Sequence, residues 1–299
     1  MDRFHLMSVF VAVAEEESFT GGARRLAMSP PAVTRAIATL EERLGIKLLT
    51  RTTRFVRTTD AGLSYLESSR RILAEADEAD EAAAGIHAAP RGQLAVTAPV
   101  LFGSLFVMSG IVDFLRHYPE VSVSAMFLDR VVNLIEEGLD VGVRIGELPD
   151  STMRAIPVGH VRRVVCAAPE YLKLSDKLEE PHDLLRHTII SATPVSPAAE
   201  WRFGAGKNAV SVKVLPRLAV TNNDGAIQAA LQGFGVTRLM SYQISGQLAA
   251  GRLKRVLTEY EPPPLPIHVL HREGRQASVK VRRFVDFLVE RLRADTALI

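Results

Sequence analysis

Side chains that could bind phosphate are concentrated in one short stretch of the chain. Between residues 24 and 57, eight basic side chains are opposed only by Glu41 and Glu42, an excess of six positive charges. They are Arg24, Arg25, Arg35, Arg43, Lys47, Arg51, Arg54 and Arg57. From Glu67 to Glu81 the sign reverses, with six acids against two arginines. A basic block beside an acidic block indicates a polyanion-facing surface, although two ordinary solvated faces would give the same pattern.

Residues for catalysis or metal binding do not form a set. The sequence has no Gly-x-Ser-x-Gly, no Gly-rich phosphate loop ending in Lys-Ser or Lys-Thr, and no histidine pair with metal spacing. His268 and His271 are three apart on an expected strand and so face opposite sides. The single Cys166 can form no internal disulfide, and we expect it to be a small buried residue. We therefore expect no enzyme activity, no metal and no cofactor.

The length of 299 residues exceeds what one core usually supports, so two or three packing units are expected. The sequence contains no run of about 18 uninterrupted apolar residues, the length needed to span a bilayer. The first residues, Met1 to His5, lead into an amphipathic pattern and not into a signal sequence. The sequence predicts a protein without a membrane segment that stays in the cytoplasm.

The N-terminal segment predicts three helices. Apolar residues with helical spacing mark the first helix over 3–16, and Ser18 offers an N-cap for a short second helix over 20–27. Ser29 can cap a third helix that has Pro30 at its first position and Gly45 as its stop. Its core side is formed by Val33, Ile37, Leu40 and Leu44. The residues left pointing outward are Pro31, Ala32, Thr34, Arg35 and Ala38.

Two short helices joined by a tight turn, the second with a small and basic outer face, favour insertion into a DNA major groove. Residues 48–59 are rich in threonine, with an arginine every third position, and predict a β-hairpin wing. Its threonines and arginines can bind phosphates or enter a minor groove. Trihelical folds that bind no nucleic acid use similar spacing, but helix order, caps and charge together favour double-stranded DNA as the partner.

The motifs of this segment run from Phe4 to Gly62. They include Ser18-Phe19-Thr20, Ala23, Leu26, Ser29-Pro30-Pro31-Ala32-Val33-Thr34-Arg35, Ile37, Leu40-Glu41, Leu44-Gly45, Leu48 to Arg54 and Thr59-Asp60-Ala61-Gly62. This pattern resembles the LysR-type transcriptional regulators. The resemblance implies DNA contacts by Ser29, Thr34, Arg35, Arg51, Thr52 and Arg54. Family members commonly carry glutamine where this chain has Pro30, so base readout there is expected to be apolar or to move to Pro31, Thr34 and Arg35.

The next segment, from Asp60 to about His87, is free of proline and has an intermittent, alanine-rich apolar stripe. Such a narrow seam suits a partner helix better than a globular core, so we expect a homodimer through this helix and a homotetramer beyond it. Residues 88–92, Ala-Ala-Pro-Arg-Gly, mark a boundary. The expected domains are a winged helix-turn-helix over 1–62, a linker helix over 63–90 and a regulatory domain over 91–299.

Strands and helices alternate beyond Gly92, which predicts an α/β fold. Expected strands cover 93–98, 121–128, 141–145, 161–168, 188–192 and 267–271, and expected helices cover 102–118, 131–138 and 278–293. Two lobes are expected, and the last strand and helix are expected to return to the first of them. Lobe I is then formed by about 91–165 and 267–299, and lobe II by about 166–266. Motifs such as 137–146, Pro169-Glu170-Tyr171-Leu172, Asn222-Asn223-Asp224 and Gly233-Phe234-Gly235 resemble the periplasmic-binding-protein-like effector domain of the same family.

In such folds a small-molecule effector lies between the lobes, near helix N-termini at the carboxyl ends of strands. Pro99, Val100 and Leu101 follow the first strand, where many family members carry serine or threonine, and Asn222 precedes a later helix. Arg144 could bind a carboxylate or could instead pair with Asp140. Asn222 and Asp224 could be plain helix caps. Weaker candidates, Ser191 and Thr193, stand at the end of the strand at 188–192.

Other classes of protein fit the sequence less well. A solute-binding protein would lack residues 1–62, and a DNA-architectural protein would leave the regulatory domain without a role. The sequence therefore favours a sequence-specific transcriptional regulator whose promoter binding or DNA bending is modulated by a small molecule.

Overall fold

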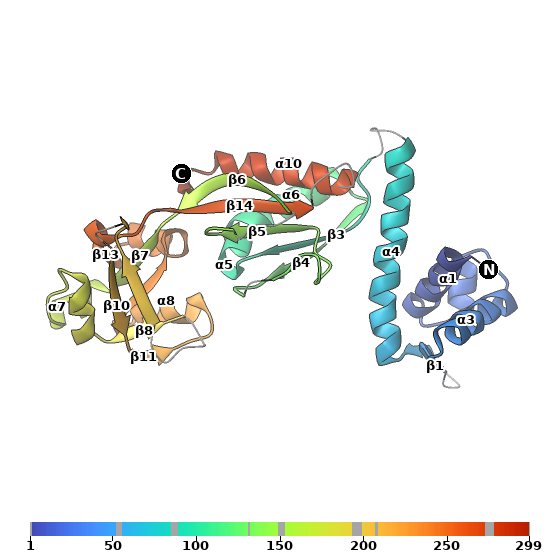
Figure 1. Ribbon diagram of the computed structural model, residues 1–299, viewed down its shortest axis with the longest axis horizontal. Coiled ribbons are helices and arrows are strands. Elements are labelled where there is room, and N and C mark those ends of the chain that lie inside the picture. The colour runs from blue at the N-terminus through green and yellow to red at the C-terminus, as the bar shows by residue number, and fades with distance from the viewer. Residues whose placement is uncertain are drawn as a thin grey trace. The chain divides into compact units, whose positions relative to one another are not determined.

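The computed structural model describes residues 2–51, 56–84, 89–130, 132–148, 153–192, 199–206, 209–272 and 278–298. The chain divides into two compact units, Met1–Ala88 and Ala89–Ile299 (Figure 1).

The first unit begins with the three helices that the sequence predicts. They are α1 (Arg3–Glu15), α2 (Phe19–Arg25) and α3 (Pro30–Leu44). The side chain of Ser18 caps α2 by accepting a hydrogen bond from the Gly21 N–H, as expected. Ser29 stands at the N-cap of α3, but its side chain makes no capping bond, so that part of the prediction is wrong. Gly45 ends α3 at φ +68°, a left-handed conformation that favours glycine.

The hairpin and a long helix complete this unit. Strand β1 (Leu49–Arg51) pairs antiparallel with β2 (Val56–Thr58), and Thr50 lies opposite Arg57. Helix α4 (Asp60–Ala84) follows directly. The core of the unit forms from the buried faces of α1 and α3, as the apolar spacing of Val33, Ile37 and Leu40 predicts. The predicted three-helix and hairpin order is confirmed for the described residues.

Helix α4 contributes to this core as well. Leu66 is buried in it, Tyr65 and Leu73 pack against it, and the Phe10 and Tyr65 rings lie 5.5 Å apart. Part of the apolar stripe that we expected to contact a partner helix therefore packs within the chain instead. Leu63 is not part of this core, and 52% of its surface is exposed.

The second unit has two lobes, each built on a five-stranded sheet. In lobe I the strand order is β4–β3–β5–β14–β6. These strands are β3 (Gly92–Ala98), β4 (Val121–Phe127), β5 (Val141–Ile145), β6 (Met153–Val161) and β14 (Leu265–Arg272). Helices α5 (Val100–Phe102), η1 (Gly103–Val107), α6 (Met108–His117) and α10 (Val279–Ala294) provide its helical layer. The core includes Phe102, Phe114, Phe284 and Leu288. The C-terminal strand and helix thus return to the first lobe, as predicted.

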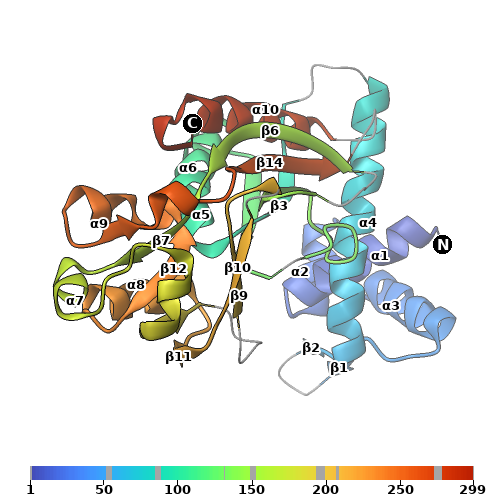
Figure 2. The same cartoon turned by 60° about the vertical axis from the view of Figure 1, so that its left-hand side comes forward.

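Lobe II, in which Figure 2 labels β7, β11 and β12, has the strand order β11–β8–β12–β7–β13. These strands are β7 (Arg163–Ala167), β8 (Ile189–Ser191), β11 (Pro216–Ala219), β12 (Val236–Met240) and β13 (Lys254–Val256). One face of the sheet packs on α8 (Asn223–Leu231) in a core that includes Cys166, Leu239 and Ala226. The other face packs on a hairpin of β9 (Ala199–Phe203) and β10 (Val210–Val214), beside α7 (Pro169–Leu174) and η2 (Pro181–Arg186). The remaining short helices are η4 (Ser241–Ile244), α9 (Ser245–Ala249), η5 (Thr258–Tyr260) and η6 (Thr296–Leu298).

The predicted helix over 131–138 is wrong. Residues 134–138 form turns, because the Asn133 side chain accepts from the Ile135 N–H and Gly138 takes a positive φ of 65°. Both features stop a helix within one turn. The predicted helix over 102–118 is present but begins at Val100 and contains the π-helical turn η1.

The stretch Val100–His117 has the length and mean hydropathy, 1.4, of a membrane span, the one such helix among the described residues. Its buried residues, which include Phe102, Val107 and Phe114, belong to the core of lobe I. We therefore interpret it as a core helix of this lobe.

Candidate nucleic-acid interface and effector site

The N-terminal turns of α3 present a surface made of small side chains and one arginine. Ser29, Pro30, Pro31 and Arg35 are exposed, and Thr34 is half-buried. Their orientation follows from the periodicity of α3, because Val33, Ile37 and Leu40 turn inward. The structure therefore brings five of the sequence-predicted DNA residues together on one end of one helix.

The wing is attached to α3 by a buried carboxylate that sequence reasoning missed. Glu41 is only 7% exposed. Its Oε1 accepts hydrogen bonds from the Leu48 N–H (3.0 Å) and the Leu49 N–H (3.1 Å), and its Oε2 accepts from Lys47 Nζ (2.6 Å). Burial alone would raise the pKa of Glu41, but these three donors outweigh burial and hold the pKa below its usual 4.5. The ionised carboxylate thus fixes where β1 begins relative to α3.

The other end of the hairpin is held by Thr59. Its hydroxyl donates to the Lys47 carbonyl (2.8 Å) and accepts from the Gly62 N–H (2.9 Å), which caps the first turn of α4. A Cβ on Gly62 would lie 2.0 Å from the Leu48 carbonyl oxygen, so only glycine allows α4 to approach the wing this closely. The Thr59 to Gly62 motif therefore joins wing and linker helix.

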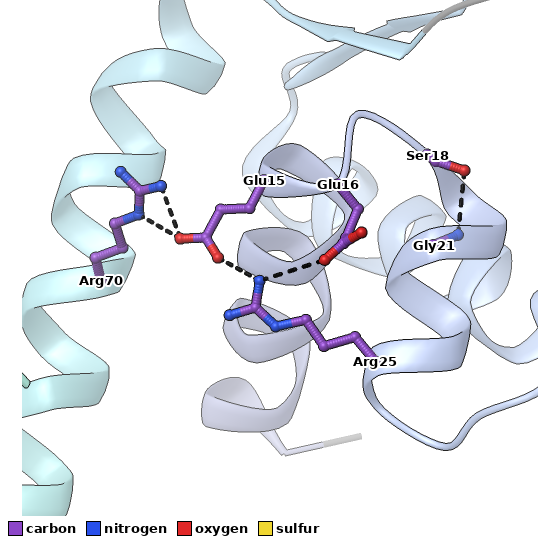
Figure 3. A network of polar contacts seen from close by, with 6 residues as sticks. All are labelled: Glu15, Glu16, Ser18, Gly21, Arg25 and Arg70. Carbon is purple, nitrogen blue, oxygen red and sulfur yellow. Dashed lines mark hydrogen bonds and ion pairs between the residues drawn. The ribbon is translucent and has the colours of Figure 1, made fainter. Parts of the chain in front are cut away.

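Three helices are tied together by one acidic residue (Figure 3). Glu15 of α1 accepts from Arg25 of α2 (2.5 Å) and from Arg70 of α4 (2.7 Å). Glu16 lies 3.9 Å from the same Arg25 nitrogen. Burial favours a raised pKa for Glu15, but the two arginines outweigh it and lower the pKa. This network fixes α2, the helix before α3, relative to the linker helix.

These ion pairs change the interpretation of the basic block. Arg25 and Lys47 are neutralised within the unit by Glu15 and Glu41. Exposed arginines that form no ion pair with any part of the described chain remain on α2, α3 and β2: Arg24, Arg35, Arg43 and Arg57. Among the described side chains of the basic block, these arginines are the ones free to pair with an external polyanion.

The predicted wing contacts are only partly described. Arg51 ends β1, opposite Val56, whereas Thr52 and Arg54 lie outside the described residues.

The predicted effector residues of the two lobes are connected through Asp129. The Asp129 carboxylate accepts from the Val100 N–H (3.0 Å) at the start of α5 and from the Asn223 side chain (3.3 Å) at the start of α8. Pro99 is the N-cap of α5, and half-buried Leu101 packs against both lobe cores. The Asn222 side chain caps α8 by accepting a hydrogen bond from the Gly225 N–H (2.8 Å), which is the helix-cap alternative given for this residue from the sequence. Sequence reasoning missed Asp129 because it follows β4 without a recognisable motif.

Arg144 lies in lobe I near the end of β5, the parallel neighbour of β3, whose end leads into α5. The expected ion pair with Asp140 is wrong, since Asp140 accepts from the Ala95 N–H (2.7 Å) and the carboxylate that acts on Arg144 is Glu137. Arg144 Nη1 donates to the adjacent Val143 carbonyl, while its buried Nη2 has no partner in the described chain. Burial lowers the pKa of Arg144, against the effect of Glu137.

Two more unpartnered polar atoms share this sheet face. His268 pairs in register with Arg144, and Thr97 pairs with Gly142, two residues before Arg144. His268 Nδ1 and Thr97 Oγ1 are buried without hydrogen-bond partners. Three unsatisfied polar groups on neighbouring strands are unusual in a folded chain and indicate a place where a polar ligand can bind.

The remaining candidates add little to this cluster. Ser191 is buried at the end of β8, and its carbonyl accepts from the Val220 N–H (2.9 Å). Thr193 lies outside the described residues. Cys166 is buried, as predicted, and burial raises the pKa of its thiol to about 12. Among the described residues, no cluster of His, Cys, Asp and Glu is arranged to hold a metal.

Family models match both units of the chain. The model of the bacterial regulatory helix-turn-helix proteins of the lysR family matches residues 4–63, and that of the LysR substrate binding domain matches residues 87–293.

Individual relatives are similar over nearly the whole length. The HTH-type transcriptional regulator PtxR of Pseudomonas aeruginosa is 34% identical over 283 residues, which cover 95% of this chain and 91% of PtxR. The solved structure of CrgA, a LysR-type regulator of Neisseria meningitidis, is 30% identical with a TM-score of 0.61, covering 96% of this chain and 98% of CrgA. The virulence activator AphB of Vibrio cholerae, 23% identical, shares the fold with a TM-score of 0.62 over 97% of this chain and 99% of AphB.

The role of Glu41 can be tested with Glu41→Ala. The substitution leaves the Leu48 and Leu49 N–H groups without their acceptor, which costs about 1–3 kcal/mol for each buried group. We expect faster hydrogen exchange at these two amides and a lower unfolding free energy of the N-terminal unit. Since the pKa of Glu41 is lowered by folding, its stabilisation is present above pH 4.5 and is lost as the pH falls through the lowered pKa.

Glu42→Ala, a change of an exposed neighbour on the same helix, is the control and should leave both amides protected. Unchanged exchange at Leu48 and Leu49 in Glu41→Ala would show that the wing is anchored by other contacts.

Proposed function

This chain belongs to the LysR family of bacterial transcriptional regulators, and we propose that it reads its operator with the first turns of α3. Its helix-turn-helix domain binds DNA and its substrate-binding domain takes a small-molecule effector, so the chain is a regulator and not an enzyme. The observation that carries the proposal is the exposed face of α3, where Arg35 stands beside small side chains and has no carboxylate partner in the described chain. A guanidinium free of internal ion pairs can address guanine edges.

We call the exposed N-terminal end of α3 the reading head, and its two prolines determine which contacts it can make with DNA. Pro30 and Pro31 occupy the first helical positions of α3, where they donate no hydrogen bond to a base. We assign them apolar contacts, such as with a thymine methyl group, and assign base hydrogen bonds to Arg35 with Ser29 and Thr34 beside it.

Wing residues are assigned to the DNA backbone. Arg51, Thr52 and Arg54 would bind phosphates on either side of the groove or enter the minor groove. The Glu41 anchor supports this assignment, because it fixes the start of β1 relative to α3. The exposed Arg57, opposite Thr50 on β2, adds a further phosphate contact to the same hairpin.

We place the effector between the lobes, near Pro99, Val100, Leu101 and Asn222. Asp129 supports this position, because it connects the starts of α5 and α8, and a ligand that takes its place changes the contact between lobes. Arg144 is assigned a polar contact with the same ligand, supported by the unsatisfied atoms around it. Ser191 and Thr193 border this region at the carboxyl end of β8.

Effector binding would then alter the spacing of the reading heads and so the bending of promoter DNA. The reason is that any ligand preferring one arrangement of the lobes shifts the population toward it.

Regulators of this family form oligomers, and we propose that this one forms dimers and then tetramers through two different faces. The first is α4, where Leu63 remains 52% exposed. The second is the outer face of η1 and α6, where Leu105, Met108 and Val112 are 53%, 39% and 39% exposed and recur at helical spacing. Two self-complementary faces on one chain close into a tetramer with two-fold symmetry.

The division of the chain follows these roles. We assign the DNA-binding domain to residues 1–62, the linker helix to 63–90 and the regulatory domain to 91–299. The start of α4 at Asp60 and the change from one compact unit to the next after Ala88 support these bounds. We place the protein in the cytoplasm, where its DNA is.

Arg35→Ala tests the reading head. We expect a loss of roughly 1–3 kcal/mol in binding to the preferred operator and a smaller loss on random DNA, because a base contact is removed. Arg51→Ala should weaken binding to the operator and binding to random DNA by similar amounts, because a phosphate contact is removed. It should also reduce the dependence of DNA affinity on salt concentration. The measurement is DNA binding at several salt concentrations, with the operator identified by genomic mapping of bound sites.

Arg43→Ala removes the same charge from the last turn of α3 and is the matched control. Equal losses on operator and random DNA in Arg35→Ala would remove Arg35 from base readout.

Footprinting tests the effector mechanism. With a metabolite shown to bind the regulatory domain, we expect the protected or hypersensitive region on the operator to change in length or position. An identical footprint under saturating ligand would contradict coupling between the lobes and the reading heads.

Glutamate substitutions test the two faces. Leu105→Glu should convert a tetramer into a dimer, because a charge in an apolar contact costs several-fold in association, and Leu63→Glu should weaken the contact through α4. Analytical ultracentrifugation of the full chain measures both.

Leu174→Glu, at the exposed end of α7, is the control, since Leu174 is 91% exposed and belongs to neither face. Sedimentation of Leu105→Glu identical to that of the unchanged chain would exclude the η1–α6 face.

A further inference from the structure

Two arginines lie side by side on the sheet of lobe II without a counter-ion. Arg163 begins β7 and Arg238 is in the middle of β12, the antiparallel neighbour of β7. Arg238 is in register with Val165, two residues from Arg163, so the two side chains are diagonal neighbours on one face. Like charges in this arrangement repel each other.

The face that carries both arginines is the one covered by the β9–β10 hairpin. Val165 and Val236, which share it, pack with Trp201 and Phe203 in one core cluster. The Arg238 guanidinium lies over the Trp201 ring, with Cζ 4.9 Å from the ring centroid. This stacking fixes the plane of the guanidinium and leaves its edge donors free to bind in that plane.

Both arginines are partly buried and electrostatically unfavourable as they stand. Burial, and second the positive charge of Arg163, lower the pKa of Arg238 to about 9. Burial also lowers the pKa of Arg163. Arg238 therefore remains charged at pH 7, and burial disfavours the charged form of both arginines. A bound anion would relieve this cost.

No carboxylate of the described chain supplies that anion. Arg238 Nη1 makes one long contact with the Arg202 carbonyl (3.5 Å), and Arg163 forms no side-chain hydrogen bond or ion pair within the described chain. The nearest acid along the hairpin, Glu200, pairs with Arg202 (3.5 Å). The preceding sequence at 193–198, Thr-Pro-Val-Ser-Pro-Ala, contains no Asp or Glu. Buried charges in folded proteins are normally paired, and the described residues provide no anionic partner for these two arginines.

We propose that Arg163 and Arg238 form a binding site for a small organic anion that carries a carboxylate or phosphate group. Two guanidinium groups on adjacent strands can share one oxyanion, each through its planar donor edge. Trp201 holds one of them in orientation by stacking against its guanidinium plane.

This site and the helix start proposed for the effector lie on opposite faces of the lobe II sheet. Helix α8 packs on the face that carries Leu239 and Cys166, whereas the arginine pair shares the face of Val165 and Val236. An anion at the arginine pair would therefore act as a second ligand, and its binding does not depend on the inter-lobe proposal.

The unchanged full-length chain provides the first test. Succinate and inorganic phosphate are titrated by calorimetry and by thermal unfolding, against sodium chloride at equal ionic strength and against the neutral succinamide. We expect saturable binding of one of the two anions and none of succinamide. Succinate alone assigns a carboxylate ligand, and phosphate alone assigns a phosphate ligand. Stabilisation no greater than that by sodium chloride would overturn the proposal.

Variants locate the site. Arg163→Gln and Arg238→Gln each remove one charge with little change in length, and each should raise the dissociation constant about tenfold or more. Arg202→Gln is the matched control, since it removes an exposed charge from the adjacent hairpin and should leave binding unchanged. Equal losses in all three variants would show non-specific attraction and overturn the site. If Arg238→Gln fails to fold, Arg163→Gln decides alone, because Arg163 stacks on no ring.

An effect on transcription is a separate readout from binding. If the anion binds at the arginine pair while the operator footprint responds only to another ligand, the second site stands and the inter-lobe effector site is the one that controls DNA binding. If the footprint ignores every ligand, the proposed function fails while the anion site remains.

Discussion

The Glu41 carboxylate accepts the first two backbone N–H groups of the wing, and the geometry of the DNA-binding unit follows from this contact. It joins α3, which carries the exposed Arg35, to β1, which begins the wing. In a winged helix-turn-helix, the position of the wing relative to the recognition helix determines which groups of DNA the two can contact together. Thr59 and Gly62 extend the same junction to α4, so recognition helix, wing and linker helix meet around residues 47–49. The relative positions of α3, the wing and α4 are therefore fixed by a few hydrogen bonds made by Glu41 and Thr59.

Much of this unit is predictable from the sequence because its determinants are local. Helix periodicity, the Ser18 cap, the Gly45 stop and the hairpin composition act within a few residues, and the structure has the elements where those signals place them. Glu41 escaped prediction because its partners lie seven and eight residues away across a turn. By composition it is simply one of two acids in a basic segment. The Glu15 network likewise joins residues 55 positions apart, which no periodicity reveals.

The regulatory unit was predicted less completely, for physical reasons that differ between elements. Strand β6 was not predicted because it is the edge strand of its sheet, carries Pro157 and shows no alternation of buried and exposed residues. The helix expected over 131–138 fails because Asn133 and Gly138 favour turns. Of the candidate effector residues, the helix starts at Val100 and Asn222 were identified from motifs. The Asp129 contact between them and the polar atoms around Arg144 depend on tertiary pairing alone.

Charge satisfaction distinguishes the two units and indicates what each binds. In the basic block of the N-terminal unit, the paired cations Arg25 and Lys47 are structural, and the exposed arginines that have no ion pair within the described chain lie on α2, α3 and β2. An exposed arginine is solvated by water, so the absence of an ion-pair partner costs little free energy. On binding a polyanion, such groups displace the counter-ions of that polyanion. In the regulatory unit, Arg144, Arg163 and Arg238 are partly buried, where leaving a guanidinium unpaired is unfavourable. A bound anion would supply the partner that these guanidinium groups lack within the described chain, which is the physical basis of the ligand proposals for both lobes.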